Sequence, residues 1–244
     1  MRCVAIVLSG GIGSRMNMNI PKQYIEVADH MIITDSIRPF VECDLVSDIQ
    51  IVADSMWHEK IIDEYRVLSK SYLGELDMGM GAYKFTGFSL PGENRQLSVL
   101  SALRDIAAGC EEEDIVIVHD AARPLISIEL IERCINAING HDGVMPVLPM
   151  KDTVYYSDNG LCVTNLLDRD RIFAGQAPEV FRTKKYLEAC ESLLPDKIME
   201  IKGSTEPAIM AGMDIVMIPG DEKNIKITTK DDLERYKNLK ELSD

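Results

Sequence analysis

The first glycine-rich segment constrains the fold of this chain more than any other feature. A short apolar run, Val4-Ala5-Ile6-Val7-Leu8, leads directly into Ser9-Gly10-Gly11-Ile12-Gly13-Ser14-Arg15-Met16. Such a run is typical of a buried parallel strand, so the glycines are expected at the carboxyl edge of a sheet. Glycines there let backbone N–H groups approach a polyphosphate, and two cations, Arg15 and Lys22, follow within the same loop. The segment therefore favours a nucleoside triphosphate over a dinucleotide as ligand.

Two other glycine motifs do not fit this segment. A dinucleotide fingerprint that starts at Gly11 would need a third glycine where Met16 stands, and the chain contains no G-x-x-x-x-G-K-[ST] string. The remaining alternative is a tight strand-to-helix turn whose glycines serve geometry alone.

Strand-like and helical stretches alternate along the whole chain. Strands are predicted at 3–8, 49–54, 83–88, 114–119, 143–149, 214–219 and 224–228, and helices at about 32–42, 56–73, 95–109, 127–139, 183–194 and 229–242. This order predicts an α/β fold with a three-layer, mostly parallel nucleotide-binding sheet, whose ligands bind at the carboxyl ends of the strands. No linker or repeat divides the chain, so residues 1–244 are expected to form one domain.

A β-hairpin is predicted at about 150–165, as an insertion between sheet strands. Two alternating runs flank Asp158-Asn159-Gly160, which is a strong hairpin turn signal. The hairpin would expose tyrosine, valine and leucine side chains, so it is a candidate arm for gripping a partner subunit.

Composition excludes several classes of partner. The net charge is −14, from 40 acidic against 26 basic residues, which argues against a nucleic-acid or anionic-membrane surface. The chain contains no apolar run of membrane-spanning length and begins with no signal-like segment, so a cytoplasmic protein without membrane insertion is expected. The six cysteines contain no C-x-x-C, which favours reduced, mostly buried thiols over a zinc site or disulfides.

Four further polar clusters lie at or beside predicted strand ends: 91–98, 118–124, 168–171 and 224–228. Lys226 lies within a predicted strand, and its side chain would simply face solvent if that strand alternates. Asp168-Arg169-Asp170 matches the D-x-D metal motif of glycosyltransferases that use nucleotide sugars. That motif stands after the hairpin instead of at the end of a central strand, and a glycosyltransferase would leave Lys22 and Lys226 unexplained. A third interpretation is a non-catalytic nucleotide sensor, but such a protein would have little reason to keep both Lys22 and Lys226.

Taken together, the clusters resemble the CTP-dependent polyol-phosphate cytidylyltransferases, which have a nucleotide-diphospho-sugar transferase-like fold. The family includes the enzymes for 2-C-methyl-D-erythritol 4-phosphate and for ribitol 5-phosphate. Over essentially the whole chain, the motifs G-x-G-x-R-M, P-K-Q-Y, G-x-x-R-x-x-S, H-D-A-A-R-P, D-T, D-R and N-I-K-I-T occur in order. Several motifs in register are far more specific than any one of them.

The resemblance implies a role for each matching residue. The CTP site would comprise Leu8, Ser9, Gly10, Gly11, Gly13, Gly92, Glu93, Arg95, Ser98 and Asp120. Arg15, Lys22, Arg169 and Lys226 would be catalytic, and Asp120 would lie near a Mg²⁺ ion bound to the phosphates. Arg123, Thr153, Arg169 and Lys226 would position the polyol phosphate. The family also implies a homodimer in which the arm of one subunit, with Thr153 and Arg169, completes the active site of the other.

The two branches of the family are not cleanly separated by this sequence. Gly10-Gly11, Gly175-Gln176 and the 224–228 run resemble the ribitol-phosphate branch, since the methylerythritol branch usually has Ala-Ala-Gly in the first loop. The 119–124 run is common to both branches or closer to the methylerythritol branch. Two segments depart from the family: Pro91-Gly92-Glu93 replaces Gly-Gly-Asp, and 203–207 stands where a Thr-Asp pair is usual. Ribitol 5-phosphate is the favoured substrate, methylerythritol 4-phosphate is the alternative, and a third alditol phosphate stays open.

Overall fold

A mostly parallel sheet forms the centre of the protein in the computed structural model, which describes residues 1–11, 20–73 and 84–242. The sheet's strands are β1 (Cys3–Leu8), β4 (Asp48–Val52), β5 (Phe85–Ser89), β6 (Ile115–Asp120), β7 (Gly143–Pro149), β10 (Phe173–Gly175), β11 (Glu179–Arg182) and β12 (Ile215–Pro219). They lie in the order β5-β4-β1-β6-β11-β7, and β10 and β12 also pair with β7. Only β10 and β11, among these described strands, run antiparallel to their neighbours. The predicted α/β sheet is therefore confirmed.

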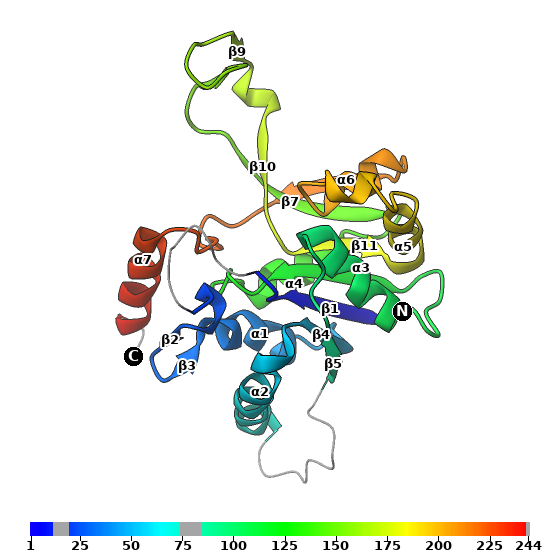
Figure 1. Cartoon of the computed structure of the whole chain (residues 1–244), viewed down its shortest axis with the longest axis vertical. Helices are drawn as coiled ribbons and strands as arrows, with labels where there is room; N and C mark the ends of the chain where they lie inside the picture. The colour runs from blue at the N-terminus through cyan, green and yellow to red at the C-terminus, as the bar shows by residue number, and fades with distance from the viewer. Residues whose placement is uncertain (12–19, 74–83, 243–244) are drawn as a thin grey trace.

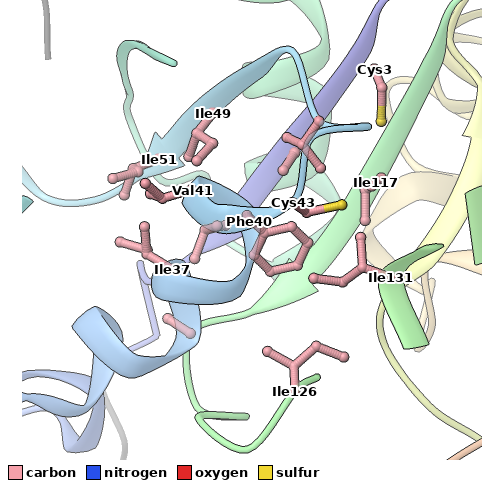
Figure 2. Close-up of a cluster of buried hydrophobic side chains, with 14 of the residues drawn as sticks. Cys3, Ile37, Phe40, Val41, Cys43, Ile49, Ile51, Ile117, Ile126 and Ile131 are labelled. Atoms are coloured by element: carbon pink, nitrogen blue, oxygen red, sulfur yellow. The ribbon is translucent and has the colours of Figure 1, made fainter. Parts of the chain in front are cut away.

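Helices cover both faces of the sheet (Figure 1). One face carries α1 (Ile32–Glu42), α2 (His58–Leu73) and α4 (Ile128–Asn136), and the other carries α3 (Arg95–Ile106), α5 (Thr183–Glu191) and α6 (Thr205–Met210). Figure 2 shows the first of these cores, where Phe40 of α1 packs among isoleucines of β4 and β6. In β1, Ala5 and Val7 face this core while Val4 and Ile6 face the opposite one, so the strand is apolar throughout.

The predicted hairpin is present as an arm, defined here as residues 150–172. Its strands β8 (Val154–Tyr156) and β9 (Asn165–Leu167) are antiparallel, and the arm extends away from the sheet (Figure 1). The side chains of Tyr155, Leu161 and Leu166 are exposed along it. The second strand ends at Leu167, slightly later than the predicted hairpin at about 150–165, because the turn includes residues beyond Asp158-Asn159-Gly160.

The strand predicted at 224–228 is wrong. These residues form no strand, and the alternation of the N-I-K-I-T run has another cause. Ile227 is fully buried in a small cluster with Leu233 and Tyr236 of α7 (Lys230–Glu241), which packs beside the sheet instead of within it. The elements β10, β11 and α6 were not predicted, because each is too short to show a clear period.

Short elements complete the described chain. They are β2 (Glu26–Val27), β3 (His30–Met31) and the 3₁₀ turns η2 (Lys22–Tyr24), η3 (Ser55–Trp57), η4 (Arg169–Arg171) and η5 (Lys197–Met199). Within the described ranges, no helix is both long enough and apolar enough to cross a membrane.

Candidate active site

The start of the loop after β1, residues 9–11, is fixed by side chains of the P-K-Q-Y segment. The Gln23 amide donates to the carbonyl oxygens of Ser9 at 2.5 Å and Gly11 at 2.8 Å, and the Tyr24 hydroxyl donates to Ser9 O at 2.9 Å. The Tyr24 ring in turn stacks on Trp57, with 4.1 Å between ring centroids. Lys22, immediately before these anchors, is therefore held close to the glycine loop. Gly13 and Arg15 lie outside the described residues.

The loop after β5 touches the glycine loop. A Cβ atom on Gly10 would overlap the Cβ of Pro91, so the glycine and the proline depend on each other. The backbone N–H of Gly92 donates to Ser98 Oγ at 3.0 Å, and Asn94 caps α3. The absence of a side chain at Gly10 thus lets Pro91 approach the start of the glycine loop. Glu93 is exposed at the tip of this loop.

A cluster of cations surrounds Asp120, the last residue of β6. Arg95 donates to Oδ1 from Nη2 at 3.1 Å, Lys226 Nζ lies 2.8 Å from Oδ2, and Arg123 Nε lies 3.7 Å from Oδ2. The three cations come from the start of α3, the loop after β12 and the loop after β6. All three therefore meet at the carboxyl edge of the sheet, as predicted for this fold.

The cations keep Asp120 ionised. Burial alone would raise the pKa of this carboxyl, but Arg95, Lys226 and Arg123 together hold that pKa well below its usual range. Burial lowers the pKa of Arg123, which Asp120 opposes by favouring the charged guanidinium. A carboxylate fixed in this way organises the three side chains without giving up its charge.

A second carboxylate, Glu179 of β11, joins the cluster and was missed by the sequence analysis. Glu179 Oε2 lies 3.8 Å from Arg95 Nη2, and Glu179 Oε1 accepts a hydrogen bond from Thr205 Oγ1 at 2.7 Å. Arg95 also donates to Ser204 Oγ. The departure of residues 203–207 from the family pattern was the sequence signal that could have pointed to Glu179, because Ser204 and Thr205 both contact this cluster.

The charges of this cluster favour an anionic ligand. Three cations face two carboxylates, which leaves a local excess of positive charge in a protein whose net charge is −14. Lys226 and Arg95 keep about a third of their side-chain surface exposed, at 34% and 31%. A phosphate that approaches this edge would therefore meet cations that are already held in place.

Asp120 is also the residue that fits a bound metal ion. Its oxygens are hard, ionised donors, which Mg²⁺ prefers, but the described residues contain no group of three or more potential ligands. Mg²⁺ is commonly held by one or two carboxylates together with substrate phosphates. The site therefore suits a metal ion that arrives with a nucleotide, provided that Lys226 releases Oδ2.

Thr153 and Arg169 lie on the arm, apart from this cluster. Both are exposed, and Arg169 donates to Lys151 O at 2.9 Å within the arm. Figure 1 shows that the arm extends away from the central sheet. The D-x-D string overlaps η4 on the arm, where the Asp168 side chain caps the turn by accepting from Asp170 N.

The Lys226 side of the site is braced by α7. Asp232 accepts hydrogen bonds from Thr228 N and Thr229 N at 2.8 Å, and Thr229 completes the capping box. Burial would raise the pKa of Asp232, but these bonds lower it to about 2. The ionised carboxylate therefore stabilises the start of α7, which begins four residues after Lys226.

The Asp232→Asn variant should reduce the free energy of unfolding by about 1 kcal/mol at pH 7, the usual cost of a lost helix cap. Because the pKa is lowered on folding, this stabilisation is complete above about pH 4 and is lost as the pH falls towards 2. Urea unfolding of both proteins between pH 7 and pH 3 measures the difference. A difference that stays constant below pH 4 would contradict the proposed ionisation.

Comparisons with known proteins identify the class. The fold resembles a 2-C-methyl-D-erythritol 4-phosphate cytidylyltransferase from Francisella tularensis with a TM-score of 0.75 and 25% identity, over 97% of this chain and 98% of that one. A 4-diphosphocytidyl-2C-methyl-D-erythritol synthase from Anaerococcus prevotii gives a TM-score of 0.78 at 21% identity, over 98% and 96%. The chain therefore shares the fold of these two enzymes.

Sequence relatives narrow the class to one family. The chain belongs to the IspD family, described as 2-C-methyl-D-erythritol 4-phosphate cytidylyltransferase, which it matches over residues 3–239. It is 33% identical over 237 residues to the protein of that name from Rubrobacter xylanophilus, over 94% of this chain and 91% of that one. It is 29% identical over 239 residues to a ribitol-5-phosphate cytidylyltransferase from Streptococcus pneumoniae, over 96% of each. The chain is therefore a cytidylyltransferase, and the predicted family and enzyme class are confirmed.

Proposed function

We propose that this enzyme transfers CMP from CTP to an alditol phosphate, with D-ribitol 5-phosphate as the preferred acceptor and Mg²⁺ as cofactor. The observation that carries the proposal is the group of three cations on Asp120, at the edge of the sheet where the glycine loop begins. The whole chain would act as one catalytic domain. A cytoplasmic location stays a prediction from the sequence.

The chemistry suits these residues. An oxygen of the acceptor phosphate attacks the α-phosphorus of CTP in line, the P–O bond to the leaving group breaks, and pyrophosphate departs. The attacking phosphate is already ionised at pH 7, so the reaction needs no strong general base. The difficulty is to bring two polyanions together, and fixed cations lower that barrier by charge neutralisation and positioning.

Each part of the site has a proposed task. Lys22, beside the anchored glycine loop, would neutralise the triphosphate, as would Arg15. Lys226 would bind the acceptor phosphate, with Arg123 and Arg95 keeping Asp120 in place between them. Mg²⁺ would be held by Asp120 and the CTP phosphates, where it supplies further charge neutralisation. Gly92, Glu93 and Ser98 would line the cytidine end.

The acceptor has two candidates. Gly10-Gly11 and Gly175-Gln176 favour ribitol 5-phosphate, and the structure shows that Gly10 could not be alanine beside Pro91 without a shift. The family description and the Rubrobacter xylanophilus relative favour 2-C-methyl-D-erythritol 4-phosphate. We rank ribitol 5-phosphate first because both loop motifs point the same way.

A parallel assay tests the proposal. Purified enzyme with CTP and Mg²⁺ is given ribitol 5-phosphate, methylerythritol 4-phosphate or glycerol 3-phosphate, and pyrophosphate release is measured. We expect ribitol 5-phosphate to give the highest kcat/KM, by at least about 10-fold, since a site that hydrogen-bonds one acceptor leaves polar groups unpaired with another. Faster turnover of methylerythritol 4-phosphate would overturn the acceptor assignment, and equal kcat/KM for CTP and ATP would overturn the cytidylyltransferase site proposed here.

A further inference from the structure

The loop that carries Lys226 is held by side chains instead of by a strand. This Lys226 loop, residues 220–228, follows β12 and crosses the carboxyl edge of the sheet. Its backbone bonds to the sheet side are few: Gly220 N donates to Val147 O at 2.8 Å and Ile227 N donates to Ala122 O at 2.8 Å. Yet Lys226 Nζ is placed 2.8 Å from Asp120. Contacts other than strand pairing must therefore fix the segment between Gly220 and Ile227.

Gln176 supplies that connection. Its side-chain amide donates to Asp221 O at 2.9 Å, and its side-chain oxygen accepts from Asp221 N at 2.9 Å. This reciprocal pair is the pattern that a neighbouring strand would make with one residue. Gln176 is buried, and its own backbone N–H donates to Pro146 O of β7 at 2.8 Å. The Gln176 side chain therefore makes the pair of hydrogen bonds that a neighbouring strand would make, although the Lys226 loop is not a strand of the sheet.

Residues beside Gln176 and Asp221 make room for this contact and support it with further hydrogen bonds. A Cβ on Gly220 would overlap Gln176 Oε1 and lie 3.1 Å from Val147 O, so only glycine lets the amide approach. Asn224 Nδ2 donates to Ala177 O at 2.6 Å, next to Gln176, and Arg123 Nη1 donates to Asn224 O at 2.7 Å. Arg123 also lies beside Asp120. The same few side chains thus hold the loop and the carboxylate that Lys226 contacts.

We propose that Gln176 is a positioning residue for Lys226: its amide locks the Lys226 loop onto the sheet and so presents Lys226 to the acceptor phosphate. The inference rests on the proposed function for the role of Lys226. Gln176 directly follows β10, the strand by which the arm returns to the sheet, so the lock also joins the base of the arm to the Lys226 loop.

Two variants separate this role from simple packing. Gln176→Met keeps the shape but neither donates nor accepts, so the KM for the acceptor phosphate should rise about 10-fold, since small displacements of a positioning group cost this much or more. The KM for CTP should stay within about 2-fold. Gln176→Glu should show the same defect at pH 9, because a carboxylate repels Asp221 O. The defect should disappear at lower pH, when the introduced carboxyl gains a proton and can donate again.

The surroundings favour that protonation. The charged groups that share this region are Asp221, Arg133, which donates to Pro219 O at 2.9 Å, and the ion pair between Lys151 and Glu222. Burial and the Asp221 carboxylate both raise the pKa of a new carboxyl at 176, while Arg133 and Lys151 oppose this. Recovery is therefore measured from pH 9 to pH 6 as the ratio of variant to wild type. A Gln176→Glu defect that stays the same from pH 9 to pH 6 would contradict the lock.

Gln50→Met is the matched control. Gln50, on β4, is also buried, and its amide likewise donates one hydrogen bond, to Ser89 at 2.8 Å, and accepts one, from Thr86 at 2.8 Å. This variant should lose stability without a selective change in the acceptor KM. Equal effects of Gln176→Met and Gln50→Met on both KM values would overturn the inference.

Hydrogen exchange separates this inference from the proposed function. In the substrate-free enzyme, amides of residues 220–228 should exchange faster in Gln176→Met than in wild type, while amides of β1 should not change. Unchanged exchange in the Lys226 loop would overturn the lock, whatever the activity. Failure of the wild-type enzyme with every polyol phosphate, together with faster exchange in the variant, would overturn only the proposed function.

Discussion

Replacing Lys226 by methionine should lower kcat/KM for the acceptor phosphate by about 10²–10³-fold, the scale found for one electrostatic donor to a reacting anion. The side chain ends at the Asp120 cluster and keeps about a third of its surface exposed, at 34%. Because the proposed partner is the acceptor phosphate, the KM for CTP should change much less. Pyrophosphate release is measured while the concentration of CTP or of the acceptor phosphate is varied, which gives the kinetic constants for each substrate separately.

Lys223→Met is the control for charge alone. Lys223 belongs to the same loop and is exposed, and its backbone N–H donates to Asp221 Oδ1 at 2.8 Å. Both variants remove one positive charge from the loop, so general electrostatic attraction of substrate falls equally. We expect Lys223→Met to stay within about 2-fold of wild type. Similar losses in both would mean that Lys226 has no specific phosphate contact.

The sequence predicted which strand ends carry the chemistry better than it predicted how the side chains are held. The β1 and β6 strands are continuous apolar runs, so the positions of Ser9 and Asp120 at their carboxyl ends followed directly. The parallel order then requires these ends to lie at one edge. In the structure Arg95 and Lys226 both contact Asp120, and the roles of these residues in binding stay predictions.

Contacts between distant segments were beyond reach of the sequence patterns. Glu179 approaches Arg95 only because the unpredicted antiparallel strand β11 lies between β6 and β7. The Lys226 loop alternates like a strand because Ile227 is buried against α7, not because it pairs with a neighbour. A periodic pattern reports burial, and the sequence alone does not say which element provides it.

Mixed dimers should recover about a quarter of wild-type activity when each subunit carries a different lesion. The structure places Lys226 on the body of the chain and Arg169 on the projecting arm, and the proposed dimer joins one body with the partner's arm. Lys226→Met and Arg169→Met homodimers should both be inactive. In a mixed two-fold dimer one site collects both lesions and the other has none. With random exchange about half of the dimers are mixed, and each has one intact site of two.

The experiment refolds the two variants together and measures pyrophosphate release, after sedimentation has established the dimer and its exchange. A control pair, Lys22→Ala with Lys226→Met, should not recover, because both residues lie on the body and every site then contains a lesion. Recovery in the control pair would show that subunit mixing restores activity by some other route. No recovery with Arg169→Met, despite exchange, would place Arg169 in the site of its own chain, or make it only one more exposed charge beside Asp170, whose carboxylate lies 4.0 Å away.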